Sequence, residues 1–267
     1  MGAPFDISYV FQFIPKLLHT LGTTLFIVFG ALLLGLIFGF IAALPRLYKV
    51  PVLQQISQVY ASFFRGTPIL IQLFLFYYGL PEVLKLAGLD LSKAPVLFFV
   101  ILTYGLQTGS YVSETIRSAV TSVDRGQVEA AYAIGMTGYQ AFTRIVMPQA
   151  LAIAVPVLSN VLIALLKDTS LAFTLGIMEL TGKSQTLASV TRHFIESYIA
   201  LALVYLVISF VLERVLLVAE RRLLRHEKRE ETAASENGFW KAIRRVLRLR
   251  LLRSPRSIRL REEAQKP

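Results

Sequence analysis

Residues 17–44 read LLHTLGTTLFIVFGALLLGLIFGFIAAL, and this apolar stretch decides the fold class. Its only ionisable side chain is His19. A helix of this length measures roughly 40 Å, enough to cross a hydrocarbon core of about 30 Å with some tilt. A cleavable signal sequence has an apolar region of only about 7–15 residues after a basic start. The stretch therefore indicates a membrane-spanning helix.

Four further apolar segments follow along the chain. They cover residues 68–80, 95–116, 150–166 and 198–218. Membrane β-strands would instead show alternating segments of about ten residues. Glycine, proline, serine or glutamine interrupts several segments, which membrane helices tolerate where neighbouring helices satisfy the freed backbone groups. The sequence predicts an all-α polytopic membrane protein, a bundle of five transmembrane helices.

Composition excludes several other classes of protein. Of the 267 residues, 55% are hydrophobic and 17% are charged, whereas globular chains have about 45–50% apolar and about 25% charged residues. The absence of cysteine removes disulfides, thiol nucleophiles and thiolate metal sites. The three histidines lie far apart in the sequence, so we expect no metal site in this chain.

The net charge of +11 is concentrated at the C-terminus, because residues 213–267 carry +8 of it. A basic segment after a final membrane span is typical of a cytoplasmic, lipid-facing tail, so we expect membrane lipid and no nucleic acid as its partner. Trp240, Ile243, Leu247 and Leu251 share one helical stripe flanked by arginines. That pattern favours an amphipathic membrane-surface helix, and the alternative is a dispensable extension.

Basic residues between the spans predict the orientation. Loop 45–66 is basic without acids, and loop 117–148 contains three arginines, whereas segments 1–16 and 81–94 balance their charges. The positive-inside bias therefore places the N-terminus outside and the C-terminus in the cytoplasm, although the basic residues of loop 167–197 run against it. The expected parts are an extracytoplasmic segment 1–16, a membrane domain 17–228 and a basic cytoplasmic tail 229–267.

Small residues recur at every fourth position of the first apolar segment, and the third repeats the spacing. They are Ala31, Gly35, Gly39 and Ala43, with Gly105 and Gly109. Such ladders let helix backbones approach closely in lipid, although a glycine-rich chain also produces them by chance. Residues 176–184 resemble a phosphate-binding loop, but five residues separate the glycines and no strand precedes them. We therefore expect no nucleotide-binding domain and no enzymatic activity in this chain.

The loop between the third and fourth spans contains a helix–glycine–helix pattern. Residues 127–134 are good helix formers, and Gly135 can adopt the positive φ that ends a helix. Thr137 or Gly138 begins a second short helix, and Pro148 sets its exit into the fourth span. A compact protrusion of this kind suits a protein partner; a surface loop without a partner is the alternative.

The same loop carries a spaced motif, E-A-A-x3-G-x9-I-x-L-P, with methionine at position 147 in place of leucine. Its residues are Glu129, Ala130, Ala131, Gly135, Ile145 and Pro148. This motif resembles that of bacterial ABC-importer permeases. The segments Phe64-Arg65-Gly66-Thr67-Pro68 and Lys167-Asp168-Thr169-Ser170-Leu171 narrow the resemblance to the polar amino acid permeases, the group of the histidine, glutamine and cystine systems. The resemblance extends over residues 15–228.

The resemblance implies a five-span type I importer fold in the bacterial cytoplasmic membrane. It implies a permease dimer, either homomeric or heteromeric, with two cytoplasmic ATPase subunits and an extracytoplasmic amino-acid-binding protein. ATP and Mg would be bound by the ATPase, and the loop containing Glu129 would be the coupling helix that docks there. The rival interpretations are a secondary transporter or channel that works without an ATPase, and a membrane anchor for an enzyme complex.

The third span carries a polar face. Gln107, Ser110, Tyr111 and Glu114 fall at i, i+3, i+4 and i+7. Polar side chains within a membrane usually face a bundle interior or a cavity, so we predict that Gln107, Ser110 and Glu114 line a substrate path. The alternative for Glu114 is an interfacial carboxylate paired with Arg117.

The end of the fourth span supplies a second candidate surface. An amino acid is a zwitterion, so its carrier needs an acceptor for the ammonium group and donors for the carboxylate. Asp168 is the expected acceptor, with Thr169 and Ser170 as donors and Asn160 nearby in the span. Similar permeases line the path with this region. The alternative is that Asp168 only balances Lys167, while the hydroxyls cap the next helix.

Overall fold

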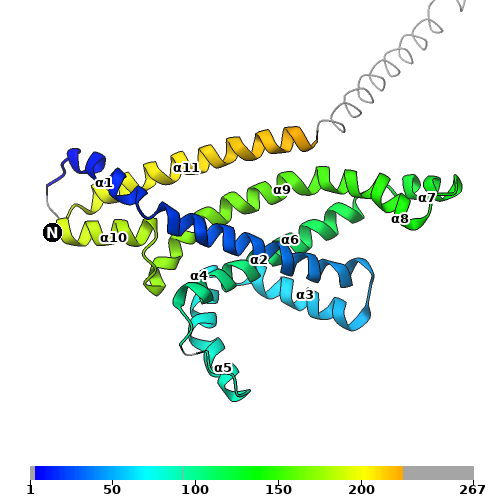
Figure 1. The fold of residues 1–267 in the computed structure, drawn as a ribbon, viewed down its shortest axis with the longest axis horizontal. Coiled ribbons are helices and arrows are strands. Elements are labelled where there is room, and N and C mark those ends of the chain that lie inside the picture. The colour runs from blue at the N-terminus through cyan, green and yellow to red at the C-terminus, as the bar shows by residue number, and fades with distance from the viewer. Residues whose placement is uncertain (1–3, 92, 225–267) are drawn as a thin grey trace, which may run out of the picture. The chain divides into compact units, whose positions relative to one another are not determined.

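The computed structural model describes residues 4–91 and 93–224, and every regular element in those ranges is helical (Figure 1). The α-helices are α1 (Ser8–Leu18), α2 (Leu21–Leu47), α3 (Pro51–Gly66), α4 (Ile69–Phe74), α5 (Leu80–Leu86), α6 (Val96–Thr121), α7 (Arg125–Ala133), α8 (Gly138–Ala141), α9 (Met147–Asp168), α10 (Leu180–Thr191) and α11 (Phe194–Leu223). Two π-helical turns, η1 (Leu75–Gly79) and η2 (Phe142–Val146), and a 3-10 helix, η3 (Thr169–Leu175), complete the set. The predicted surface helix around Trp240 lies outside the described residues.

The structure confirms the predicted all-α class and the five spans. The stretches long and apolar enough to cross a membrane are Leu21–Leu47, Ile69–Leu86, Val96–Thr121, Gly138–Leu175 and Phe194–Leu223. The predicted start of the first span was wrong: Leu17 and Leu18 belong to α1, and the chain turns at His19 and Thr20 before α2 begins. Hydropathy could not reveal that turn, because apolar residues lie on both sides of it. The other four spans are longer than the predicted apolar segments.

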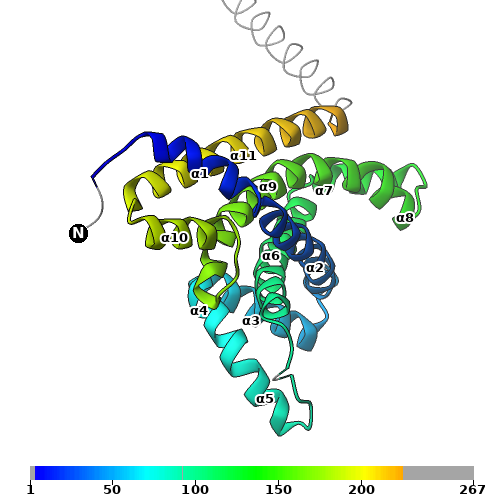
Figure 2. The same ribbon diagram turned by 60° about the vertical axis from the view of Figure 1, so that its left-hand side comes forward.

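Helix α1 was not predicted, and it lies mostly within the expected extracytoplasmic segment 1–16. Its buried residues, Val10, Phe13 and Leu17, share one face and join a core cluster with Leu180 of α10 and Ala200 of α11. Apolar residues spaced three and four apart are typical of a helix with one buried side. Figures 1 and 2 both show α1 beside α10 and the start of α11.

The small-residue ladder packs α2 against α6, as predicted. Ala31, Gly35, Gly39 and Ala43 are all buried. A Cβ atom added to Gly35 would lie 2.7 Å from Cγ2 of Thr108, and one added to Gly39 would lie 2.5 Å from Cβ of Val112. Both separations are far below ordinary van der Waals contact. The two backbones therefore approach as closely as glycine permits, as in other small-residue membrane interfaces.

The main core cluster lies where α2, α4, α6 and α9 meet. Its largest fully buried side chains are those of Ile27, Leu73, Val100, Tyr104 and Leu166. Elsewhere on the spans large apolar side chains are exposed, including those of α2 and α11. This inside-out distribution suits helices whose outer faces contact lipid tails.

Candidate functional site

The loop between α6 and α9 folds as the sequence predicts. The Asp124 carboxylate caps the N-terminus of α7, accepting a hydrogen bond from the backbone N–H of Gly126 at 2.8 Å. Helix α7 ends at Ala133, and Gly135 follows with a φ of +85°. Glycine adopts this left-handed conformation without the steric cost that a Cβ imposes. The chain therefore reverses at the predicted position.

A capping box begins the second short helix, α8. Oγ1 of Thr137 accepts from the backbone N–H of Gln140 at 3.3 Å, and the Thr137 backbone N–H donates to Oε1 of Gln140 at 2.9 Å. The π-turn η2, which contains Ile145, then leads into α9, with Pro148 at its second position. Between the two halves, Nε2 of Gln149 donates to Oε1 of Gln127 at 2.7 Å.

Much of this loop is exposed. Ala131 is buried and anchors α7, whereas Glu129 and Ala130 lie at the surface. Large side chains are exposed too, with Ile134 at 75% and Tyr139 at 78%. Apolar side chains gathered on a protruding loop are typical of a surface that a partner covers. Figure 1 shows α7 and α8 together beyond the end of α9.

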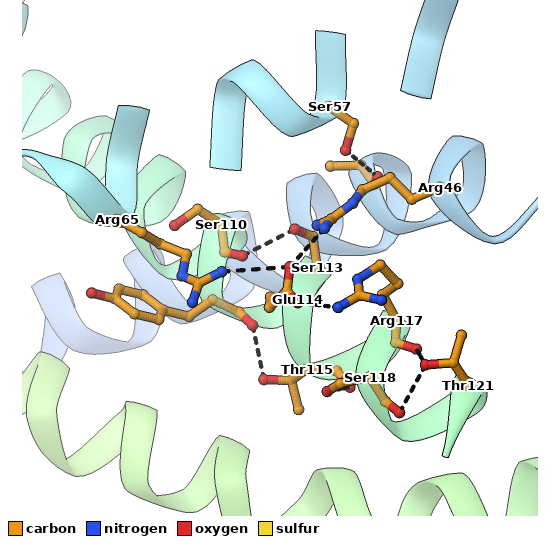
Figure 3. Close-up of polar contacts among 12 residues, drawn as sticks. Arg46, Ser57, Arg65, Ser110, Ser113, Glu114, Thr115, Arg117, Ser118 and Thr121 are labelled. Carbon is orange, nitrogen blue, oxygen red and sulfur yellow. Dashed lines mark hydrogen bonds and ion pairs between the residues drawn. The ribbon is translucent and has the colours of Figure 1, made fainter. Parts of the chain in front are cut away.

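A charged cluster gathers at the end of α6 nearest this loop. Glu114 lies between three arginines from three helices: Arg46 of α2, Arg65 of α3 and Arg117 of α6 (Figure 3). Nη2 of Arg46 donates to Oε2 of Glu114 at 2.7 Å. Nη2 of Arg117 donates to Oε1, which confirms the pair considered as the alternative for Glu114. Of these four side chains only that of Arg46 is nearly buried, at 10% exposure, and a charge so placed needs a partner such as Glu114.

A cavity of about 330 Å³ opens between α6 and α9. Its lining residues are Gln107, Thr108, Tyr111, Val157, Asn160, Val161, Ala164, Leu165 and Asp168. Three predicted path residues, Gln107, Asn160 and Asp168, are thereby brought together from two helices. Within the described ranges no ion pair joins Asp168 to Lys167, so nothing in the geometry favours the balancing role considered for Asp168.

The remaining predicted path residues do not line this cavity. Ser110 is buried and donates its hydroxyl to the carbonyl of Gln107 at 2.6 Å. Thr169 is buried too, and its Oγ1 donates to the carbonyl of Leu166 at 2.6 Å. Ser170 is half-buried in η3. Serine and threonine hydroxyls in helices often bond the carbonyl one turn back, so a shared helix face did not guarantee a shared cavity.

Sequence reasoning missed Arg46 and Arg65 as members of the site. In the sequence Arg46 is recognisable only as a loop charge that indicates the orientation. Arg65 lies within the Phe64–Pro68 motif, and that motif was the available signal. The guanidinium carbon of Arg65 lies 5.9 Å from the ring centroid of Tyr111, a cation–π contact that joins the arginine cluster to the cavity wall.

The segment that resembled a phosphate-binding loop forms a helix cap instead. The carboxylate of Glu179 begins α10 by accepting the backbone N–H groups of Thr181 at 2.8 Å and Gly182 at 2.9 Å. The side chain is fully buried, and burial raises the pKa of Glu179 despite these two hydrogen bonds. The role of Glu179 is therefore structural, as the N-cap of α10.

Comparisons with known proteins bear on all of these features. Residues 35–225 match the family described as the binding-protein-dependent transport system inner membrane component. The L-cystine transport system permease protein TcyL of Bacillus subtilis (strain 168) is 44% identical over 89% of this chain and 99% of its own length.

Solved structures agree with this match. One, described as an amino acid ABC transporter with histidines, superposes with a TM-score of 0.73 at 30% identity, covering 82% of this chain and all of the other. An inward-facing structure of the MetNI methionine ABC transporter shares the fold, with a TM-score of 0.59 at 18% identity over 82% of this chain and 99% of that one.

Proposed function

The chain belongs to the family of binding-protein-dependent transport system inner membrane components, and from this premise we propose that it is the permease subunit of an ABC importer for polar amino acids. It carries the substrate inward across the bacterial cytoplasmic membrane. ATP hydrolysis, with its Mg, takes place in a separate ATPase dimer, and this chain contributes no catalytic group. A second permease chain, identical or related, completes the path.

The exposed α7–α8 loop carries this proposal. Its backbone is fixed by the Asp124 cap, the turn at Gly135 and the capping box at Thr137, so the loop is preorganised without a partner. Its surface presents exposed large side chains beside Glu129. A preorganised protrusion loses little conformational entropy on docking. A rigid loop of this kind would let an ATPase docked on it transmit force to the membrane spans.

The substrate class rests on the cavity between α6 and α9. Asp168 offers a carboxylate to an ammonium group, while Gln107 and Asn160 offer amides. Two proteins similar to this chain are named as L-cystine transport system permeases, and another is named as a nopaline transport system permease. If an extracytoplasmic binding protein delivers the substrate, we expect Asp168 on the outer side of the membrane and the α7–α8 loop in the cytoplasm.

Co-purification tests the ATPase assignment. The chain is co-expressed with a candidate ABC ATPase from the same organism, and the permease is captured by an affinity tag. We expect the ATPase to co-purify, and Glu129→Lys to reduce the captured amount by about tenfold, as at a protein–protein hot spot. Glu82→Lys on α5 is the matched control, because it reverses an exposed charge outside the loop. Equal capture with both variants would overturn the docking assignment.

Reporter fusions test the orientation. A reporter active only outside the cytoplasm is fused after Leu86 or after Arg125. We expect activity after Leu86 and none after Arg125, since basic loops stay in the cytoplasm. The reverse pattern would place the α7–α8 loop out of reach of an ATPase and favour a transporter or channel that works alone.

A further inference from the structure

The cluster around Glu114 holds more positive charge than its one carboxylate neutralises. In the part of the chain that the structure describes, Arg46, Arg65 and Arg117 ion-pair with Glu114 and with no other acid. The side chain of Arg46 is only 10% exposed, and its Nε and Nη1 have no hydrogen-bond partner among the described residues. Buried cationic donors without partners are costly, so the cluster is electrostatically suited to a second oxyanion.

The three arginines contribute unequally. Hydrogen bonds from Arg46 and Arg117 occupy both oxygens of Glu114. Nη1 of Arg65 lies 3.4 Å from Oε2, longer than a hydrogen bond of good geometry. The side chain of Arg65 is also the most exposed of the three, at 44%. Arg65 therefore keeps donor capacity that a ligand can use, while its two neighbours hold Glu114.

Arg65 adjoins one wall of the cavity through Tyr111, although it is not itself among the residues that line the cavity. Its guanidinium contacts the Tyr111 ring, which lines that cavity. Asp168 lies beside Tyr104 of α6, because the Tyr104 hydroxyl donates to the Asp168 backbone carbonyl at 2.6 Å. Tyr104 and Tyr111 are two turns apart on α6, roughly 10 Å at the helical rise. Asp168 lines the cavity and Arg65 contacts Tyr111, another lining residue, whereas the hydroxyl of Thr169 is bonded to the carbonyl of Leu166.

We propose that Arg65 binds the carboxylate of the transported amino acid beside Tyr111, where the arginine cluster adjoins this cavity. The assignment rests on the proposed function, since it takes the ligand to be an amino acid. It replaces Thr169 and Ser170 as the expected carboxylate donors, and it completes the zwitterion site that Asp168 begins. A guanidinium suits the role because its planar donors match both oxygens of a carboxylate. Arg65 is then a specificity residue that distinguishes acids from neutral analogues.

A comparison of an amino acid with its amide tests this assignment. Uptake of L-cystine, L-glutamine, L-histidine and L-arginine into proteoliposomes, with the ATPase and binding protein present, first identifies a transported substrate. That amino acid and its carboxamide are then titrated against the permease–ATPase complex without the binding protein. We expect wild type to prefer the acid by about 10- to 100-fold, and Arg65→Gln to bring the ratio close to one.

Two further variants separate ligand binding from structural support. Arg65→Lys keeps the cation and should retain part of the preference, whereas Lys85→Gln removes an exposed cation on α5 and should leave the ratio unchanged. A purely structural role for Arg65 would weaken acid and amide binding equally. An unchanged ratio in Arg65→Gln, or no preference in wild type, would overturn the assignment. Absence of uptake of any amino acid would instead overturn the proposed function.

Discussion

The α7–α8 loop and the Glu114 cluster lie at the same end of α6 but are built in opposite ways. The loop is fixed by neighbours in sequence: Asp124 bonds Gly126, and Thr137 bonds Gln140. The cluster joins three helices, and the pair of Arg46 with Glu114 is separated by 68 positions. The side chains on the surface of the loop are available to a partner. Those of the cluster form ion pairs that join three helices. Damage to the cluster should therefore affect folding, and damage to the loop should affect coupling.

The largest expected effect is on stability, from Glu114→Gln. This change leaves three arginines without their common counter-charge. Breaking a fully buried ion pair costs about 3–5 kcal/mol, and because the Glu114 side chain is 23% exposed we expect a smaller loss, about 2–3 kcal/mol. Thermal unfolding of the purified protein in detergent measures the loss. Glu129→Gln is the matched control on the exposed loop, where surface substitutions stay within about 0.5 kcal/mol. Similar unfolding temperatures for the two variants would contradict the contrast between the regions.

Asp168→Asn should reduce uptake by roughly 10- to 100-fold, because a charge-assisted hydrogen bond contributes about 1.5–3 kcal/mol. Substrate uptake into proteoliposomes measures this, while ligand binding to the separate binding protein and basal ATP hydrolysis should stay normal. The double variant Lys167→Met with Asp168→Leu distinguishes the rival role. If uptake recovers in the double variant, Asp168 serves only to balance Lys167.

Gly135→Val should cost about 1–2 kcal/mol at the turn, because a β-branched residue adopts positive φ poorly. Nothing lies within 4 Å of a Cβ at this position, so the cost is conformational and not steric. Gly135→Asn should be tolerated, since asparagine enters the left-handed region more readily. ATPase co-purification and the amount of permease in the membrane are measured together. We expect Val to lower only the first, and equal loss of both would place the fault in folding.

The smallest expected effect is that of Thr137→Ala, which removes half of the capping box. Loss of such a cap costs about 1 kcal/mol. Amide hydrogen exchange in α8 should become faster, while exchange in α6 should not change. Unchanged protection in α8 would show that tertiary contacts, and not the cap, hold this short helix.

The loop was predictable from sequence because its determinants are local. The stop at Gly135 and the start at Thr137 follow from backbone preferences of single residues, and the structure places both as expected. The ladder from Ala31 to Ala43 was predictable for a similar reason, since its period matches a helix face. Hydropathy likewise located the spans, apart from the turn that separates α1 from α2.

The cluster was only partly predictable. The pair of Glu114 with Arg117 follows from their spacing on one helix, and it was considered. The contributions of Arg46 and Arg65 depend on how α2 and α3 dock against α6, which no local pattern specifies. The positions of the serine and threonine hydroxyls were the least predictable. A hydroxyl that bonds a carbonyl of its own helix and a hydroxyl that faces a cavity occur at the same spacing in the sequence. The predicted roles of Asp168 and of the loop motif remain predictions.

The close approach of α2 and α6 has a mechanical consequence for the transport cycle. Side chains that interlock without spare volume resist sliding and rotation, since either motion drives atoms into overlap. With Gly35 and Gly39 seated against Thr108 and Val112, the two helices should move as one rigid strut. Any rearrangement that opens the cavity must then be taken up on its other wall, by α9. The α7–α8 loop is connected to α9 directly through η2, so a displacement of the loop would be transmitted to α9. The α2–α6 pair would then stay fixed while α9 moves relative to it.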